Sequence, residues 1–149
     1  MKSCIFEDLP ARLEAGIQHY SGAIGLGAAV DYLSSIGMKN IESHERELAK
    51  DLVEGMLNVP GLELIGTKDY KKRGALVAFN IKGMEPHEVA IMLDEQNVFV
   101  RSGMHCAYPL HKFLHDAKGS VRASLYFYNT KDEVKIFIEK LSNIAKTFK

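Results

Sequence analysis

A cysteine with a histidine beside it and an arginine five residues upstream is the part of the chain best suited to chemistry. Cys106 ends the run Arg101-Ser102-Gly103-Met104-His105-Cys106. Only the thiolate form of cysteine attacks, and it needs positive charge or an ionisable partner nearby. A lone cysteine can equally be a small buried hydrophobe, and adjacent side chains in a strand point to opposite faces. The pattern therefore makes Cys106 a candidate nucleophile and leaves the inert alternative open.

The residues before Cys106 predict the element that positions it. Residues 98–101 are apolar and β-branched up to Arg101, which is typical of a strand, and Gly103 lies in the loop that follows. Reactive side chains are common on loops that a rigid scaffold holds in place. We therefore expect Cys106 to lie on a loop at the end of a strand.

The composition indicates a single soluble globular domain. The chain has 149 residues, of which 46% are hydrophobic and 26% charged, and its 19 basic residues balance 19 acidic ones. A net charge of zero argues against a nucleic-acid or membrane-surface partner, because neither polyanion would be attracted over long range. We find no apolar run long enough to span a membrane and no signal-peptide pattern.

Cysteine and histidine usage favours a reducing, cytoplasmic setting without a metal site. The two cysteines, Cys4 and Cys106, lie far apart and make no disulfide framework. The six histidines are scattered, and the CxxC and HExxH patterns of metal sites do not occur.

Periodicity predicts helices and strands that interleave without strict βαβ alternation. This order indicates an α+β fold, a two-layer sandwich with a largely antiparallel sheet. The expected helices are residues 21–37, 40–57, 86–97, 110–118 and a last one after Thr130; the expected strands are 62–65, 75–81, 98–101 and 121–127. The strand at 75–81 is almost continuously apolar, which predicts a central position.

Several side chains carry more local predictions. Ser21 is expected to begin the first long helix and Gly37 to end it, while Thr130 and Glu133 have capping-box spacing. His44 lies on the polar face of its helix, which favours an exposed surface residue. The basic loop at residues 68–73 is expected to be solvated only.

Four segments, in this order, resemble the cysteine desulfurases, most closely their sulfur-mobilisation and selenocysteine-lyase branch within the class V aminotransferase fold. The resemblance runs from about Phe6 to the C-terminus. The segments are Glu14-Ala15-Gly16, Gly22-Ala23-Ile24-Gly25-Leu26-Gly27-Ala28-Ala29, Arg101-Ser102-Gly103-Met104-His105-Cys106-Ala107 and Val121-Arg122-Ala123-Ser124-Leu125-Tyr126-Phe127-Tyr128-Asn129-Thr130.

The resemblance implies roles for four residues. Members of the family use pyridoxal phosphate to release alanine from L-cysteine and leave a persulfide on a loop cysteine, which Cys106 matches. Arg122 matches the arginine that pairs with the substrate carboxylate, although a structural ion pair is the alternative. Arg101 matches an arginine near the cysteine and counts as a second substrate-binding candidate. His105, before the nucleophile, has either a proton-transfer or a loop-shaping role.

The chain also departs from the family pattern. The family's Schiff-base lysine lies in a large N-terminal cofactor domain that has no counterpart here, so residues 17–149 correspond to the small C-terminal domain and residues 1–16 to a connecting lead-in. Ile17 replaces a threonine that reaches the cofactor phosphate across a dimer interface, and Met104 stands where histidine is frequent.

These departures lead to an expectation about activity. Without a lysine for the cofactor, the chain is not expected to be active alone. It would need a large-domain chain or second subunit in a homo- or hetero-oligomer, and a sulfur acceptor protein would take its persulfide. The alternatives are a persulfide carrier or docking module, or an inactive remnant.

Overall fold

The structure is a computed structural model that describes residues 5–115 and 119–147. Cys4 therefore lies outside the described residues. The chain divides into two compact units, Met1–Met38 and Lys39–Lys149.

The first unit consists of a short 3-10 helix, Ala11–Leu13, and the helix α1, Tyr20–Ile36. Gly37 ends α1 as predicted: its φ is 92° and its N–H donates to the carbonyl of Leu33 at 3.0 Å. The predicted start at Ser21 is wrong. The carbonyl of His19 already accepts the N–H of Ala23 at 3.0 Å, so the helical bonding begins before Ser21.

Helix α1 buries none of its residues within the described part of the chain. Ile24 and Leu26 are 72% and 67% exposed. A Cβ added at Gly25 or Gly27 would meet nothing within 4 Å. The surface of α1 around Gly25 and Gly27 is therefore open in this unit.

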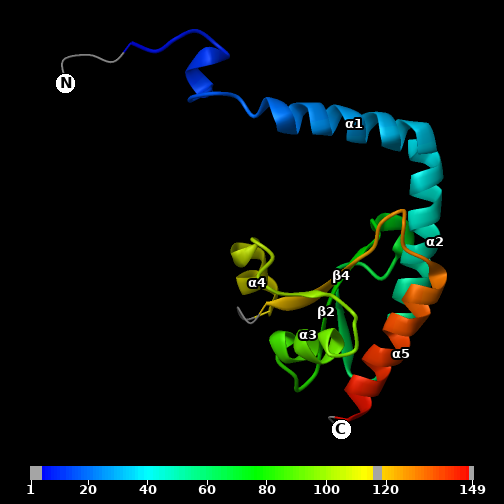
Figure 1. Ribbon diagram of the computed structural model, residues 1–149. Coiled ribbons are helices and arrows are strands. Elements are labelled where there is room, and N and C mark those ends of the chain that lie inside the picture. Colours follow the sequence, from blue (N-terminus) through cyan, green and yellow to red (C-terminus); the bar gives the residue numbers. More distant parts are fainter. Residues whose placement is uncertain (1–4, 116–118, 148–149) are drawn as a thin grey trace. The chain divides into compact units, whose positions relative to one another are not determined.

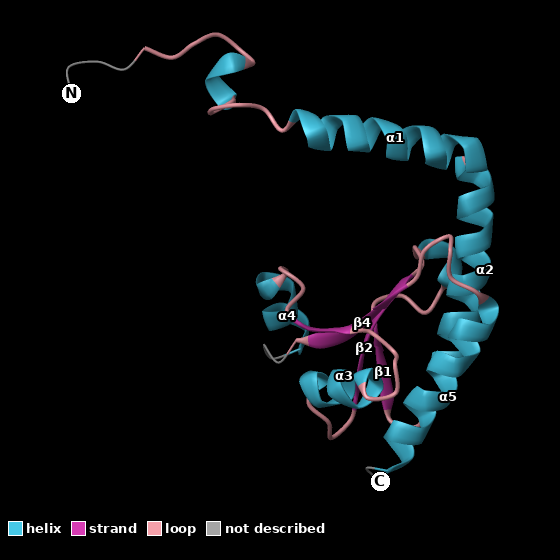
Figure 2. Cartoon of the chain, in the orientation of Figure 1, coloured by secondary structure: helices cyan, strands magenta, loops and turns pink. Residues whose placement is uncertain are grey.

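The second unit is built on a four-stranded antiparallel sheet with strand order β1-β2-β4-β3 (Figure 2). The strands are β1, Leu62–Ile65; β2, Leu76–Ile81; β3, Arg101–Gly103; and β4, Ser120–Ser124. The α+β fold class with an antiparallel sheet is confirmed, and β2 has the inner position that its apolar sequence predicts.

Three helices pack against the sheet and form the core. They are α2, Met38–Met56; α3, Pro86–Asp94; and α5, Lys131–Thr147. Helices α2 and α5 run side by side (Figure 1), close enough that a Cβ at Gly55 would lie 2.8 Å from Ile138. Alternate residues of β2 and β4 complete the core: Val77, Phe79, Ile81, Val121 and Ala123. The helices therefore bury the apolar face of the sheet.

Two predicted strands differ from the observed ones because some of their backbone N–H groups donate to acceptors outside the sheet. Residues 98–100 form no ladder: the N–H of Val98 donates to the carbonyl of Leu93 at the end of α3 instead. Strand β4 ends at Ser124, short of the predicted Phe127, since the N–H of Tyr126 donates to Oδ1 of Asn129 at 2.8 Å.

The capping box before α5 is confirmed. Glu133 accepts the N–H of Thr130 at 2.8 Å and donates its own N–H to Oγ1 of Thr130 at 3.2 Å. His44, predicted as an exposed surface residue, is half-buried instead. Its Nε2 lies 2.9 Å from the carbonyl of Asn129 and must donate, because a carbonyl only accepts. His44 thus ties α2 to the turn that precedes α5.

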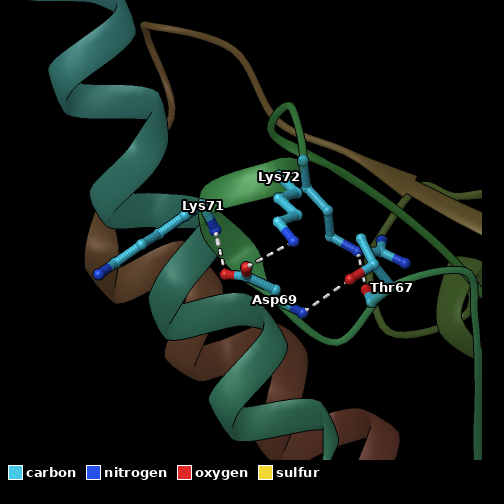
Figure 3. A network of polar contacts seen from close by, with 5 residues as sticks. Thr67, Asp69, Lys71 and Lys72 are labelled. Carbon is cyan, nitrogen blue, oxygen red and sulfur yellow. Dashed lines mark hydrogen bonds and ion pairs between the residues drawn. The ribbon is translucent and has the colours of Figure 1, made fainter.

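The loop at residues 68–73 is more ordered than the predicted solvated loop (Figure 3). Asp69 accepts the N–H of Lys71 at 3.0 Å and donates its own N–H to Oγ1 of Thr67 at 3.1 Å. The guanidinium of Arg73 donates to the carbonyls of Ile65, Thr67 and Leu76. Arg73 therefore closes the connection between β1 and β2, which charge pattern alone did not indicate.

The edge pairing of β3 and β4 leads to a stability prediction for Gly119. A Cβ at Gly119 would lie 2.7 Å from the carbonyl carbon and oxygen of Gly103, and its φ is +83°. Gly119→Ala should lower the free energy of unfolding by about 2–5 kcal/mol, the sum of backbone strain and overpacking. Urea unfolding followed by circular dichroism measures the change.

Gly83→Ala is the matched control, because Gly83 has a φ of +85° but open space around its Cβ position. It should lose only the strain, about 1–2 kcal/mol. Equal losses in the two variants would contradict the close approach of the strands.

Candidate functional site

The face of the sheet opposite the helices is polar where β3 meets β4. Along β4 the buried Val121 and Ala123 alternate with Ser120 and Arg122, whose side chains point to the other face. The register pairs Arg101 with Arg122 and Gly103 with Ser120. Two guanidinium groups therefore stand on neighbouring strands, in directly opposed positions.

The candidate nucleophile lies on the loop that follows β3, as the sequence predicts. Cys106 is exposed and its thiol is free. His105 and Cys106 have φ angles of 51° and 59°, the left-handed region that residues other than glycine rarely adopt. Such strain persists only where surrounding contacts hold it, and it is common at functional sites.

Arg101 lies next to the thiol. Its Nη2 is 3.9 Å from Sγ of Cys106, within the longer hydrogen-bond range of sulfur. The structure thus brings together two of the predicted site residues, five positions apart in sequence. The Cys106 sulfur therefore has a positively charged group as its neighbour.

The ring of His105 bonds to strand β4 through Ser120. Its Nε2 lies 3.0 Å from the carbonyl of Ser120 and 3.2 Å from the Ser120 hydroxyl. The carbonyl can only accept, so Nε2 carries the proton and the lone pair is on Nδ1. Burial, followed by the nearby charges of Arg122 and Arg101, holds the pKa of His105 below its usual value. His105 is therefore a neutral ring that anchors the loop to β4.

Arg122 is half-buried on the polar face of the sheet. Its Nε is buried without a hydrogen bond. No carboxylate of the described residues lies within ion-pair distance of its guanidinium. The predicted alternative, a structural ion pair, thus finds no support in the described part of the chain, whereas an incoming anion would satisfy Arg122.

Two further residues of the site were missed from sequence. Ser120 anchors His105, and His111, only 6% exposed, packs with its ring centroid 5.7 Å from that of His105. His111 lies on the short helix α4, Tyr108–His115, which leaves the Cys106 loop. No sequence pattern marked His111, because the apolar residues beside it on α4, Leu110 and Phe113, are the exposed ones.

Two negative findings apply to the described residues. They hold no cluster of three or more His, Cys, Asp or Glu side chains that could bind a metal ion. Within the same residues, no helix is both long and apolar enough to cross a membrane.

The comparison with known protein families shows to which family the chain belongs. A model of the class-V aminotransferases matches residues 1–137. The chain belongs to that family.

Relatives within the family agree with the resemblance found in the sequence. A probable cysteine desulfurase from Synechocystis is 46% identical over 142 residues, which cover 95% of this chain and 34% of the relative. Another from Methanothermobacter thermautotrophicus is 41% identical over 144 residues, 95% of this chain and 36% of the relative. The similarity to cysteine desulfurases is thus confirmed, and the chain spans about a third of their length.

This chain also covers about a third of the length of the solved structures that it matches. The apo cysteine desulfurase of Thermococcus onnurineus matches with a TM-score of 0.85 and 40% identity over 93% of this chain and 34% of that one. The Escherichia coli cysteine desulfurase CsdA, in an S-sulfonic acid form, matches with a TM-score of 0.83 and 29% identity over 96% and 35%.

The lowered pKa of His105 predicts a pH dependence of stability. Because the pKa of His105 is lower in the folded chain, its protonation favours the unfolded chain. The stability that the neutral ring contributes is therefore fully present above the ordinary pKa of 6.5 and is lost as the pH falls through the lowered pKa. The thermal midpoint should fall between about pH 7.5 and about pH 5, and less steeply in His105→Asn. Thermal scans across this range measure both slopes.

His19→Asn serves as the control, since His19 is exposed on the first unit. Its slope should equal that of the unchanged chain. A slope that His105→Asn leaves unaltered would contradict the neutral, anchored ring.

Proposed function

We propose that this chain is the C-terminal part of a pyridoxal phosphate-dependent cysteine desulfurase, in which Cys106 accepts the sulfur of L-cysteine. The observation that carries the proposal is the exposed Cys106 thiol beside Arg101. It lies on a strained loop next to a half-buried arginine, whose Nε has no hydrogen bond among the described residues, in a chain similar to cysteine desulfurases.

The sulfur step follows from the thiolate chemistry of Cys106. The Cys106 thiolate attacks the sulfur of the substrate, so that an S–S bond forms while the Cβ–S bond of the substrate breaks. The electron pair of the broken bond stays with the substrate carbon, which takes up a proton and becomes the methyl group of alanine. Cys106 is left as a persulfide for transfer to an acceptor. Its exposure suits both steps.

In this proposal each arginine interacts with a different anionic group, one with the substrate carboxylate and the other with the Cys106 thiolate. Arg122 binds the substrate carboxylate, which would satisfy its Nε through charge-assisted hydrogen bonds. Arg101, 3.9 Å from the Cys106 sulfur, supports the thiolate and is the second substrate-binding candidate.

His105 has the loop-shaping role of the two that the sequence left open. Its Nε2–H is committed to Ser120, and the arginines nearby make a further proton on the ring unfavourable. These contacts favour an anchor over a residue that carries a proton through the reaction.

The described residues around Cys106 suit a sulfur and a carboxylate but do not make up a pyridoxal phosphate site. When bound, that cofactor acts as an electron sink for the substrate. We assign none of this chain's residues to holding it. A large cofactor domain, from a longer chain or a second subunit, is part of the proposal, as is a protein that accepts the sulfur.

Substitution of Cys106 tests the proposal directly. The chain is incubated with L-cysteine, pyridoxal phosphate and a separately purified large domain of a cysteine desulfurase; alanine release and the mass of the chain are followed. Alanine release should depend on the added domain, and an added sulfur should appear on Cys106. Cys106→Ala should abolish both, because the thiolate is the attacking group.

The outcomes separate the remaining alternatives. Turnover that survives Cys106→Ala would overturn the assignment. Persulfide formed on Cys106 by an external sulfur donor, without turnover under any condition, would favour the carrier alternative. The absence of both would leave an inactive remnant.

Arg122→Lys tests the carboxylate-binding role. Lysine keeps the charge but loses the paired hydrogen bonds of a guanidinium. The KM for L-cysteine should rise about ten- to a hundredfold, the factor for a lost hydrogen bond to a charged group. Arg46→Lys, on an exposed helix surface, is the matched control and should leave the KM unchanged. An Arg122→Lys enzyme with an unchanged KM would contradict the role.

A further inference from the structure

Two buried nitrogen atoms beneath the Cys106 loop lack partners. Nδ1 of His105 and Nδ1 of His111 are both buried, and neither forms a hydrogen bond with the described residues. An unpaired buried polar atom costs about 1–3 kcal/mol. An apolar side chain at position 111 would avoid that cost, so the histidine there calls for an explanation.

The two rings are neighbours. Their centroids are 5.7 Å apart at an interplanar angle of 52°, which is contact range for aromatic rings. The backbone N–H of His111 donates to the carbonyl of Ala107 at 3.1 Å. The backbone of His111 is therefore tied to the residue after Cys106, while the ring of His105 is tied to Ser120 on β4.

The two unpaired atoms are complementary in their hydrogen-bonding character. Because Nε2 of His105 donates to a carbonyl, Nδ1 of that neutral ring is an acceptor. His111 with a proton on Nδ1 would be the matching donor. A hydrogen bond between the two Nδ1 atoms, direct or through one bridging water, would satisfy both nitrogens at once.

We propose that His111 is a positioning residue, whose Nδ1–H donates to Nδ1 of His105 directly or through one water. This bond fixes the His105 tautomer that holds Ser120, and thereby keeps Cys106 in its left-handed conformation beside Arg101. Histidines whose second nitrogen sets the tautomer are common in sites that need a fixed ring. The purpose of the loop rests on the function proposed above, but the bond itself involves neither cofactor nor substrate.

Two substitutions separate this role from simple space filling. His111→Phe keeps an aromatic ring and removes the donor. His111→Asn removes the ring but places an amide N–H near the position of Nδ1. A polar positioning role is lost in the first variant and kept in the second, whereas a packing role gives the opposite order.

The test uses the full chain without cofactor. Nitrogen-detected NMR reports the tautomers of His105 and His111, and the rate of iodoacetamide alkylation at pH 7, followed on the Cys106 peptide by mass, reports the thiol. In the unchanged chain His105 should carry its proton on Nε2 and His111 on Nδ1.

His111→Asn should keep the His105 tautomer and an alkylation rate within about twofold of the unchanged chain. In His111→Phe, His105 should become a mixture of tautomers. Cys106 alkylation should slow about fivefold, the factor for one hydrogen bond of about 1 kcal/mol, as the loop relaxes away from Arg101.

Three results would overturn the proposal: a proton on Nε2 of His111 in the unchanged chain, a His111→Phe variant with unaltered signals, or a His111→Asn variant that behaves like it. The first needs no variant and so does not depend on folding. Since no readout involves L-cysteine or pyridoxal phosphate, failure of the desulfurase proposal would leave these results intact, and the reverse also holds.

Discussion

The short pairing of β3 with β4 is the interaction on which the site depends. Three residue pairs at the edge of the sheet place Arg101 opposite Arg122 and Gly103 opposite Ser120. The close approach of the backbones at Gly103 and Gly119 leaves no room for a side chain and so fixes this register. Since side chains alternate along a strand, a slip of one residue would turn Arg122 and Ser120 toward the helices.

The division of the sheet into an apolar and a polar face explains how the site is supported. Phe79 and Val121 are fully buried under the helices, and this burial supplies the stability. The polar face carries features that cost stability: like charges in directly opposed positions, two left-handed residues and unpaired buried nitrogens. The stability of the core offsets these costs, and all of these features lie close to the Cys106 thiol.

Local sequence patterns predicted most elements of the fold but not where every strand begins and ends. The bounds of β1 and the box at Thr130 and Glu133 follow from neighbouring residues, and both are confirmed. Residues 98–100 have strand composition, yet Val98 bonds to the end of a helix. His44 and Arg73 looked like solvated surface because their acceptors are carbonyls brought close only by folding.

The same limit applies to the site. Cys106 could be proposed from its residue type and its predicted loop, whereas Arg122 became a candidate only through the resemblance to cysteine desulfurases. The anchor of His105 could not be predicted, since its principal partner is the carbonyl of Ser120, an atom that every residue carries. Only the register of β3 on β4 selects that carbonyl, and only the packing of α4 brings His111 against the same ring. The candidate nucleophile can be recognised in the sequence, whereas the contacts that hold its conformation exist only once the sheet has formed.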